Sequence, residues 1–384
     1  MAGAHLRDHR VHVLHPSELT AAETENWQAL RQRTGEYGSC LFSPDFAVLA
    51  GQSRSDARIG FIYRDDSLVC IFPYHKRASG FARPLGAPFS DYSGPMVVPG
   101  KAPDLPGILR LLGLAAYRSG TLLDPGNHFA IPEHARTETN LIRLGNLDPE
   151  TYIEAQRAAY PKRFKNFRRL ERRMEEQFPQ LEFRFGPPEP EAYKALLELK
   201  SAQFQQSGLI DLTRAKYARD MLDTVARAPQ GFMLGLWHKD RLLSGHFGIR
   251  IGAKFHPWIA AYQPDLSAFS PGNVLLKRII AAMPEMELTE YDLSGGDDHY
   301  KKYYANASRT IGHIYGASTS LLGRTRQAQN GLWRAAGAHL TGSRANRLRN
   351  RVDHGAVCHP RLSERMSDIA YALQNRSVNP AIAE

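Results

Sequence analysis

Apolar residues recur along the chain with two different spacings, and the spacing identifies the elements. Alternating runs at 57–64 and 68–75 flank a short acidic turn, a combination that predicts a β-hairpin. A second hairpin is predicted at 231–238 and 241–251, with a further strand at 253–262. The other predicted strands lie at 11–14, 121–123, 140–144, 181–185 and 288–293.

A spacing of three to four residues between apolar positions predicts the helices. This spacing is found at 105–119, 190–207, 213–226 and 272–283. Near the N-terminus, a helix is predicted from Pro16 through Leu30 with Ser17 as its N-cap. A strongly basic helix is predicted at residues 152–177, with an interruption near Pro161.

The two halves of the chain show a similar order of elements. Helices precede an antiparallel meander, and a strand, a helix and a strand follow, which is typical of an α+β fold bordering on α/β. Because both halves show this order, we expect a tandem duplication of one domain. The predicted parts are an N-terminal domain at 1–150, a basic linking helix and strand at 151–186, a C-terminal domain at 187–320 and an Arg-rich appendage at 321–384.

The composition narrows the class of protein. A chain of 384 residues exceeds one hydrophobic core, and 42% hydrophobic residues are ordinary for a soluble globular protein. No window of 18 uninterrupted apolar residues is present and the N-terminus has no apolar segment, so we expect neither a transmembrane helix nor a secretory signal. Cys40, Cys70 and Cys358 are widely spaced, which favours a reducing cytoplasm.

The net charge of +10 is concentrated in two segments. Residues 162–173 and 324–384 each carry a local charge of +6, so the rest of the chain is slightly acidic. We expect any anionic partner at these segments. For the first, a solvated helix face competes with contacts to a lipid-linked glycan, to anionic membrane or to RNA.

In the second basic segment, guanidinium groups could clamp a nucleotide, because their forks match phosphate oxygens and the guanine edge. A cyclic dinucleotide is a fitting ligand, and a disordered basic tail is the competing interpretation. The candidate residues are Arg344, Arg347, Arg349 and Arg351.

Two motifs in the second half resemble a known group of enzymes. The first has Ala-Tyr-x-Pro at 261–264 and Ser-Pro-Gly at 270–272, and the second has Tyr-Asp-Leu-x-Gly-Gly-Asp at 291–297 and Tyr-Lys at 300–301. Together they resemble the BioF2-like or CelD-like acetyltransferases of the GNAT superfamily, which are related to the Fem peptidoglycan aminoacyltransferases. The basic helix and parts of the first half are also similar to this group, so the resemblance spans roughly residues 10–318.

The resemblance implies two GNAT-like domains, each a mixed, largely antiparallel sheet flanked by helices. It also implies an acetyltransferase or related acyltransferase that uses acetyl-CoA or another acyl-CoA as donor. The implied acceptor is an amine of an amino sugar or polysaccharide precursor, free or lipid-linked, in exopolysaccharide biosynthesis. We therefore expect a cytoplasmic protein, with the inner membrane face as a peripheral location.

Two other functions are also consistent with the sequence. In the Fem branch the donor is aminoacyl-tRNA, and the basic helix would suit that partner. The other alternative is a catalytically weak regulatory protein whose Arg-rich appendage binds an anionic ligand such as a cyclic dinucleotide.

The loop at 270–273, Ser-Pro-Gly-Asn, stands where the common GNAT pyrophosphate loop reads [RQ]xxGx[GA], and only Gly272 is shared in kind. As a phosphate cradle, it would use the close approach allowed by Gly272 and free N–H groups from residues 273–275. As a helix start, it would use Ser270 as the N-cap. The donor-binding candidates are Ser270, Gly272, Asn273, Val274 and Lys301.

The acidic turn after the last strand supplies the candidates for proton transfer. Asp292 lies at a strand end and is the expected general base for the attacking amine, while an ordinary Asp/Gly turn competes. The resemblance implies that Tyr300 protonates the departing thiolate. His246, on a strand, is a further catalytic candidate against the alternative of a core histidine.

Substrate contacts are expected from a Gly- and Pro-rich loop and from the first motif. Asp91 and Tyr92 lie in that loop, which could face a cleft between the domains, and Tyr262 belongs to the motif. No cluster of His, Cys and Asp has the spacing of metal ligands, so we expect no catalytic metal.

Overall fold

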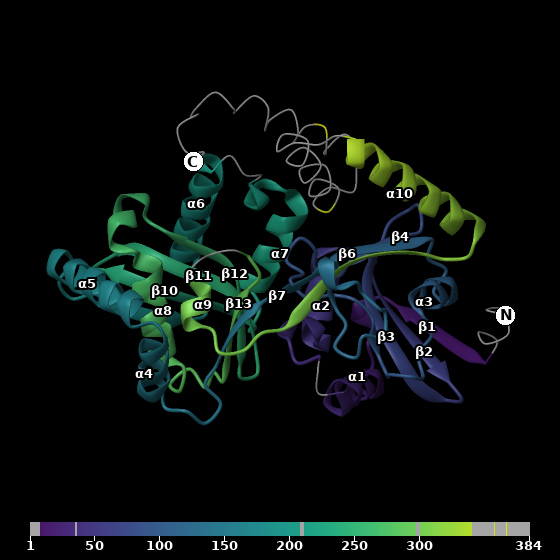
Figure 1. Cartoon of the computed structure of the whole chain (residues 1–384), viewed down its shortest axis with the longest axis horizontal. Coiled ribbons are helices and arrows are strands. Elements are labelled where there is room, and N and C mark those ends of the chain that lie inside the picture. The colour runs from purple at the N-terminus through teal and green to yellow at the C-terminus, as the bar shows by residue number, and fades with distance from the viewer. Residues whose placement is uncertain are drawn as a thin grey trace. The chain divides into compact units, whose positions relative to one another are not determined.

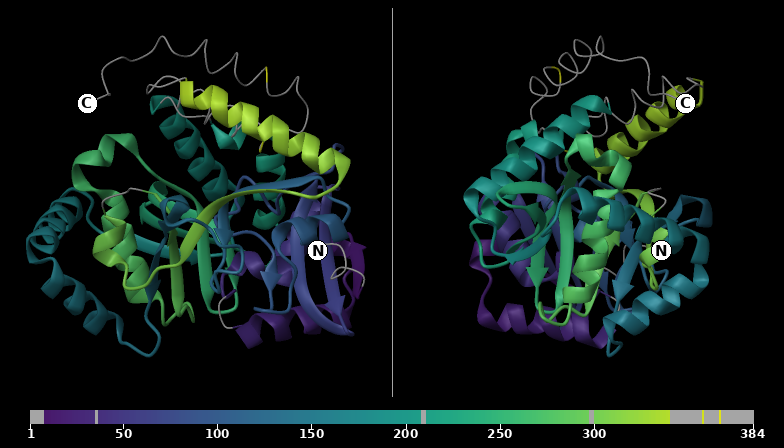
Figure 2. Two further views of the ribbon diagram at one scale, coloured as in Figure 1. Left: turned by 45° about the vertical axis from the view of Figure 1, so that its right-hand side comes forward. Right: turned by 90° about the vertical axis from the view of Figure 1, so that its left-hand side faces the viewer.

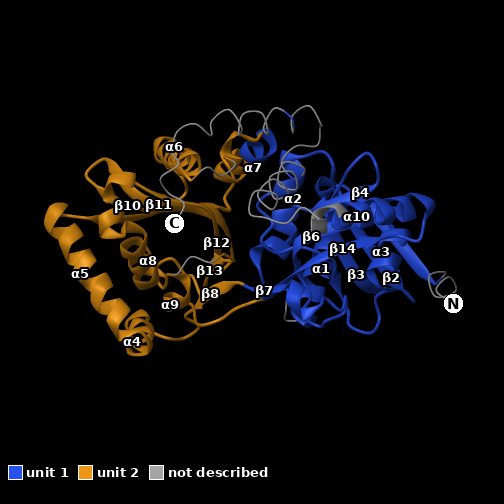
Figure 3. Cartoon of the chain, turned by 45° about the horizontal axis from the view of Figure 1, so that its top comes forward, with its two compact units in different colours: residues 1–138, 216–221, 310–375 blue, residues 139–215, 222–309, 376–384 orange. Residues whose placement is uncertain are grey.

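The computed structural model divides the chain into two compact units, which are described separately. The described residues are 8–34, 37–207, 211–296 and 300–339, with Val357 and Met366, and the side chains of 336–339 are not described. Unit 1 comprises residues 1–138, 216–221 and 310–375, and unit 2 comprises 139–215, 222–309 and 376–384 (Figure 3). Each unit contains one mixed sheet flanked by helices, so the expected α+β fold with two such sheets is confirmed.

Unit 1 is built on an eight-stranded sheet. Its strands are β1 (His9–Leu14), β2 (Ala57–Arg64), β3 (Ser67–Lys76), β4 (Phe81–Pro84), β5 (Met96–Val97), β6 (Ala116–Leu123), β7 (Arg136–Glu138) and β14 (Thr310–Ala317). The order is β1-β2-β3-β4-β6-β14-β7, with β5 beside β3. The predicted hairpin is formed by β2 and β3, and the positive φ angles of Asp65 and Asp66 allow its tight turn.

The helices of unit 1 surround this sheet. They are α1 (Ala21–Thr34), α2 (Pro44–Ser53), α3 (Leu105–Leu111) and α10 (Leu321–His339), with 3₁₀ turns η1 (Pro16–Glu18), η2 (Cys40–Phe42) and η3 (Glu133–Ala135). Figure 2 shows α10 as the long yellow-green helix that follows β14. Its position is fixed by Tyr315, whose hydroxyl donates to the carbonyl of Arg326 at 2.8 Å, and by Arg118, which donates to Asn330 at 2.7 Å.

The predicted bounds of two helices in unit 1 are wrong. Ser17 caps no α-helix, because α1 begins only at Ala21, where Thr20 and Glu23 exchange hydrogen bonds between side chain and backbone. The helix expected at 105–119 ends at Leu111. Gly113 follows with a φ of 64°, and the chain then enters β6.

Unit 2 is built on a six-stranded sheet with the order β8-β13-β12-β11-β10-β9. Its strands are β8 (Asn140–Arg143), β9 (Glu182–Gly186), β10 (Gly231–His238), β11 (Arg241–Ile251), β12 (Lys254–Tyr262) and β13 (Glu290–Ser294). Its helices are α4 (Pro149–Ala159), α5 (Pro161–Gln177), α6 (Pro190–Gln206), the end of α7 (Lys216–Ala226), α8 (Pro271–Ala282) and α9 (Lys301–Tyr304), with η4 (Leu212–Arg214) and η5 (Pro264–Phe269) (Figure 1). The break near Pro161 separates α4 from α5, as predicted.

Helices cover both faces of the unit 2 sheet. On one face, α6 packs on β11 and β12, where the rings of Tyr193 and Phe247 meet at 4.9 Å. On the other face, α8 contributes Leu275 and Ile279 to a buried cluster with Phe255 and Tyr291. Because side chains alternate along a strand, neighbouring residues of β11, β12 and β13 face different helices.

Candidate active site

The strands β12 and β13 run parallel but pair only at their beginnings. Lys254 pairs with Glu290, and Phe255 pairs with Tyr291. Beyond Phe255, β12 continues to Tyr262 with no described strand along that side. Polar side chains of both strands are buried where the two strands part, and this region is the candidate active site.

Arg309 joins two buried carboxylates of β13. Its Nη1 donates to Asp292 at 3.1 Å, and its Nη2 donates to Glu290 at 2.6 Å. Arg143 donates to the other oxygen of Glu290 at 2.7 Å. Burial pushes the pKa of Glu290 upward, but the charge of Arg309 and the hydrogen bonds outweigh it and lower this pKa below its usual value. The ionised form of Glu290 is therefore the one that the fold stabilises.

Asp292 also contacts a histidine and a serine on the same face of the sheet. Its Oδ2 lies 3.3 Å from Nδ1 of His256, and its Oδ1 accepts from the backbone N–H of Ser294 at 2.8 Å. The Oγ of Ser294 lies 3.4 Å from Nε2 of His256. This serine–histidine–aspartate row begins at a half-buried hydroxyl and ends at a carboxylate with 3% exposure. Such a row can accept a proton at one end and stabilise the resulting charge at the other.

Ser294 ends β13 with a φ of 58°, in the left-handed region that residues other than glycine rarely adopt. Holding a serine there costs roughly 1–3 kcal/mol, and such strain often marks a functional turn. Neither Ser294 nor His256 was predicted as a site residue. The signal for Ser294 was its place between a strand and two glycines, whereas His256 gave no signal because it reads as an ordinary strand residue.

His246 and Tyr291 form a second buried polar pair, on the α8 face of the sheet. Nδ1 of His246 and the hydroxyl of Tyr291 share a short hydrogen bond. Burial, followed by the charges of Lys200 and Lys301, lowers the pKa of His246 to about 4, so this imidazole is neutral at neutral pH. Burial, with smaller contributions from Tyr300 and Asp292, raises the pKa of Tyr291 well above its usual value. His246 lies on a strand as expected, and its catalytic role stays a prediction.

The loop before α8 differs from the predicted cradle. Ser270 has a φ of 53° and its side chain caps nothing. The N–H groups of Asn273 and Val274 both donate to the carbonyl of Ser270, at 2.9 and 3.4 Å, so the expectation that they are free is wrong. In the first turn of α8, Gly272 is the residue whose N–H donates to no described residue.

Space and charge at the start of α8 suit an anion. A Cβ placed on Gly272 would meet no atom within 4 Å. The first turn contains no acidic residue, and the helix is twelve residues long, so its dipole favours a negative group there. Asn273, in contrast, lines a cavity of only about 10 Å³ beside α5, where its Oδ1 is buried without a described partner. That cavity has room for about one water molecule, not for a phosphate.

The basic helix α5 is attached to α8 through its acidic residues. Glu171 accepts from Lys277 at 2.6 Å, and Glu175 accepts from Arg278 at 2.6 Å. Its apolar residues Phe164, Leu170 and Met174 are buried. The seven basic residues of the predicted patch are all exposed: Lys162, Arg163, Lys165, Arg168, Arg169, Arg172 and Arg173.

The remaining predicted residues lie in several environments. Lys301 is only 8% exposed and donates to the carbonyl of Gly295 at 2.5 Å, so its ammonium already holds the turn after β13. Tyr300 is half-buried at the start of α9, and Tyr262 is exposed at the end of β12. Arg344, Arg347, Arg349 and Arg351 lie outside the described residues.

Asp91 and Tyr92 belong to unit 1, where Tyr92 is buried and Asp91 is half-buried. Their loop is held by His75, whose Nε2 accepts from the N–H of Gly86 at 3.0 Å while its Nδ1 lies 2.8 Å from Asp56. The loop that carries them is thus tied to the buried interior of unit 1.

Two further features concern the described residues as a whole. They contain no group of three or more His, Cys, Asp or Glu side chains that could hold a metal ion. None of the described helices has both the length and the apolar character needed to cross a membrane. Cys40 and Cys70 are buried, and Cys358 lies outside the described part.

Comparison with known proteins identifies one domain. Residues 161–302 match the family model described as an acetyltransferase (GNAT) domain. No curated protein sequence matches the chain. The matched segment begins with α5 and ends within α9, so it contains β12, α8 and β13.

The solved structures that are similar to this chain share little sequence with it. A tandem GNAT protein from the clavulanic acid biosynthesis pathway is 14% identical with a TM-score of 0.45, over 81% of this chain and 99% of that one. FemX is 11% identical with a TM-score of 0.45, over 79% and 95%. L-PGS from Bacillus licheniformis is 11% identical with a TM-score of 0.42, over 76% and 90%.

Proposed function

We propose that the GNAT-type domain matched at residues 161–302 is an N-acyltransferase that moves an acyl group from acyl-CoA to an amine. The observation that carries this proposal is the separation of β12 and β13 beside the buried row of Ser294, His256 and Asp292. An amine must lose a proton to become a nucleophile, and this row lies where a proton acceptor is needed.

The donor is held, in this proposal, at the start of α8. The N–H of Gly272, the open space over its Cα and the positive end of the helix dipole suit a phosphate of CoA. When bound, acyl-CoA supplies a thioester carbonyl as the electrophile. Ser270 shapes the loop through its left-handed backbone, and Asn273 and Val274 contribute to the helix start.

The proton leaves the attacking ammonium through Ser294. Its Oγ accepts a hydrogen bond from the amine and passes a proton to Nε2 of His256, and Asp292 stabilises the imidazolium that forms. Asp292 thereby acts through His256, as a positioning residue, and the hydrogen bond from Arg309 holds its carboxylate in place. Tyr300 is proposed as the proton donor on the leaving-group side.

The acceptor that we propose is an amino sugar or polysaccharide precursor at the inner face of the cell membrane. The exposed basic residues of α5 support an anionic acceptor, such as a lipid-linked glycan. The same basic face also favours a second candidate function, a Fem-like transfer from aminoacyl-tRNA. The two donors are distinguishable because tRNA binding falls steeply with salt.

The test is an assay of thiol release from acetyl-CoA with a panel of amino sugars, combined with thermal shift. We expect acetyl-CoA to raise the unfolding temperature and an amino sugar to stimulate thiol release. If neither effect is seen, and the chain binds tRNA with an affinity that falls steeply from low to high salt, aminoacyl-tRNA would be the favoured donor. Absence of all three would overturn both.

Substitution of Gly272 tests the donor site directly. We expect Gly272→Asp to weaken acyl-CoA binding by at least about tenfold, since a carboxylate would occupy the space proposed for a phosphate. The thermal stability should not fall, because an added Cβ meets no atom within 4 Å and an acid at a helix start is favourable.

The matched control is Gly272→Ala, which adds a Cβ without charge and should weaken acyl-CoA binding less than the aspartate does. Isothermal titration calorimetry with CoA measures both variants. Equal affinities for the aspartate and alanine variants would place the donor elsewhere.

A further inference from the structure

The strand β14 of unit 1 has an open edge. It is paired along most of its length on one side, but only at its beginning on the other. On the first side, β14 pairs with β6 from Ile311 to Ala317. On the second side, β7 pairs only with residues Thr310 to Gly312. Within the described residues, no strand covers the second side from His313 onward. Such an edge offers N–H and C=O groups with which another extended chain can pair.

The backbone groups on this open side belong to Tyr315 and Ala317. The N–H of Ser318 donates to the carbonyl of Ala115 at 2.9 Å, which fixes the alternation of the antiparallel pair. Gly316, two residues earlier, therefore faces β6, and its two neighbours face away from it. Neither Tyr315 nor Ala317 has a backbone partner on the open side in the part of the chain that the structure describes.

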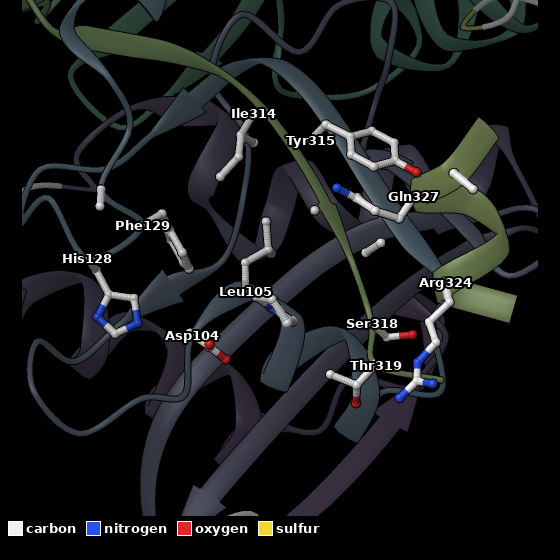
Figure 4. Close-up of a pocket in the computed structure, with 15 residues that line it drawn as sticks. Asp104, Leu105, His128, Phe129, Ile314, Tyr315, Ser318, Thr319, Arg324 and Gln327 are labelled. Atoms are coloured by element: carbon white, nitrogen blue, oxygen red, sulfur yellow. The ribbon is translucent and has the colours of Figure 1, made fainter. Parts of the chain in front are cut away.

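A groove of about 880 Å³ follows this edge (Figure 4). Leu105 and Phe129 lie on one side of the strand, and Gln327 of α10 lies on the other. Leu105 packs so closely on Gly316 that a Cβ there would come within 2.4 Å of its Cδ2. The volume lies in the range of pockets that bury a drug-sized ligand, and Tyr315 and Ala317 beside it are half-buried.

The rim of the groove at α10 favours an acidic side chain. Arg324 is exposed at the rim, and its guanidinium has no partner among the described residues. Asp104 already accepts from the N–H of Gly107 at 2.9 Å, and Nε2 of His128 donates to the carbonyl of Pro103 at 2.9 Å. Since α10 contains no acidic residue, Arg324 is not neutralised from its own helix.

We propose that this groove binds an extended peptide with an acidic side chain, by adding it as a strand beside Tyr315 and Ala317. The backbone of the peptide pairs with the open edge, its alternate side chains contact Leu105 and Phe129, and its carboxylate meets Arg324. The five residues from His313 to Ala317 span about 16 Å, so a pentapeptide fills the edge. The site lies wholly in unit 1 and does not depend on acyl transfer.

The test uses the full chain and an N-acetylated, C-amidated pentapeptide of sequence Thr-Val-Glu-Val-Thr with a fluorescent label. We expect saturable binding by fluorescence anisotropy with a dissociation constant of about 1 mM or tighter. Hydrogen exchange followed by mass spectrometry should show slower exchange in the segment that contains Tyr315 and Ala317. No binding, or protection confined to other segments, would overturn the proposal.

Two matched peptides separate strand addition from other modes of binding. Methylation of a backbone nitrogen that faces β14 should weaken binding about tenfold, because one hydrogen bond is lost. If the methylated and unmethylated peptides bind equally well, strand addition is wrong and the groove contacts only the side chains of the peptide. Replacement of Glu by Gln in the peptide should weaken binding about two- to fivefold.

Two variants of the protein complete the test. In Arg324→Gln, the difference between the Glu and Gln peptides should disappear, and its persistence would overturn the proposed carboxylate contact. Ala317→Pro removes an N–H that faces the open side without removing a bond to β6, so it should weaken peptide binding about tenfold with an unchanged circular dichroism spectrum. If Ala317→Pro does not fold, the methylated peptide gives the same information on the unaltered chain.

Discussion

Replacing His256 by Gln is expected to lower kcat/KM for acyl transfer by about 10²–10⁴-fold, the usual contribution of a placed proton acceptor. His256 lies 3.4 Å from the hydroxyl of Ser294 and 3.3 Å from the carboxylate of Asp292. Glutamine fills similar space and its amide can hydrogen bond, but it cannot take up a proton. Steady-state thiol release from acetyl-CoA measures the effect.

The matched control is His238→Gln, at the end of β10 in the same sheet. His238 is half-buried against Phe178 and has no part in the proposed proton path, so its variant should retain kcat/KM within about threefold. Thermal unfolding verifies that both variants fold. A folded His256→Gln variant with unchanged kcat/KM would remove His256 from the mechanism and make His246 the histidine to test next.

Replacing Arg309 by Met is expected to lower the free energy of unfolding by about 3–5 kcal/mol at neutral pH. The side chain of Arg309 is 6% exposed, and its removal leaves Asp292 and Glu290 buried without their shared cation. Methionine keeps much of the volume, so the loss comes from charge and not from a cavity. Urea unfolding followed by circular dichroism measures the difference from the unaltered chain.

The pH dependence of that difference follows from Glu290. Because its pKa is lowered in the folded state, the stabilisation is present above the pKa of an unfolded glutamate, about 4.3, and is lost as the pH falls through the folded value. The gap between Arg309→Met and the unaltered chain should therefore be largest near pH 7 and shrink below about pH 4.

Arg143→Met is the matched control for this prediction, because Arg143 also donates to Glu290 but is 45% exposed. It should cost less than about 1 kcal/mol, since water screens exposed ion pairs. If the two variants are equally stable, the buried position of Arg309 does not carry the stabilisation that we assign to it.

Local sequence patterns predicted most elements of this fold. The hairpin of β2 and β3, the hairpin of β10 and β11, and helix α8 were predicted within a few residues of their observed bounds. Their signals are local, because alternation of apolar residues and turn composition act over fewer than about ten residues. The helix predicted at 105–119 was wrong in its second half because residues 116–119 pair with distant β14.

The candidate site stays a prediction, and the structure shows where its predicted residues lie and which neighbours they have. Asp292, His246 and the loop at 270–273 were all identified in the sequence, and the structure puts them on the two strands and the helix of one sheet. His256 and Ser294 were missed because they are 38 residues apart and meet only across β12 and β13. Arg309 was missed for the same reason, since its two carboxylates lie on another strand.

The sequence by itself determined the class of fold, the basic helix and the segment that carries the candidate chemistry, because periodicity, charge and short motifs are properties of consecutive residues. The tertiary structure decided which of those groups are available. It joined Asp292 to Arg309 and His256, turned the N–H groups of Asn273 and Val274 back onto Ser270, and left one edge of β14 open. Hydrogen bonds and ion pairs between distant segments depend on how the strands are arranged, which no local pattern records.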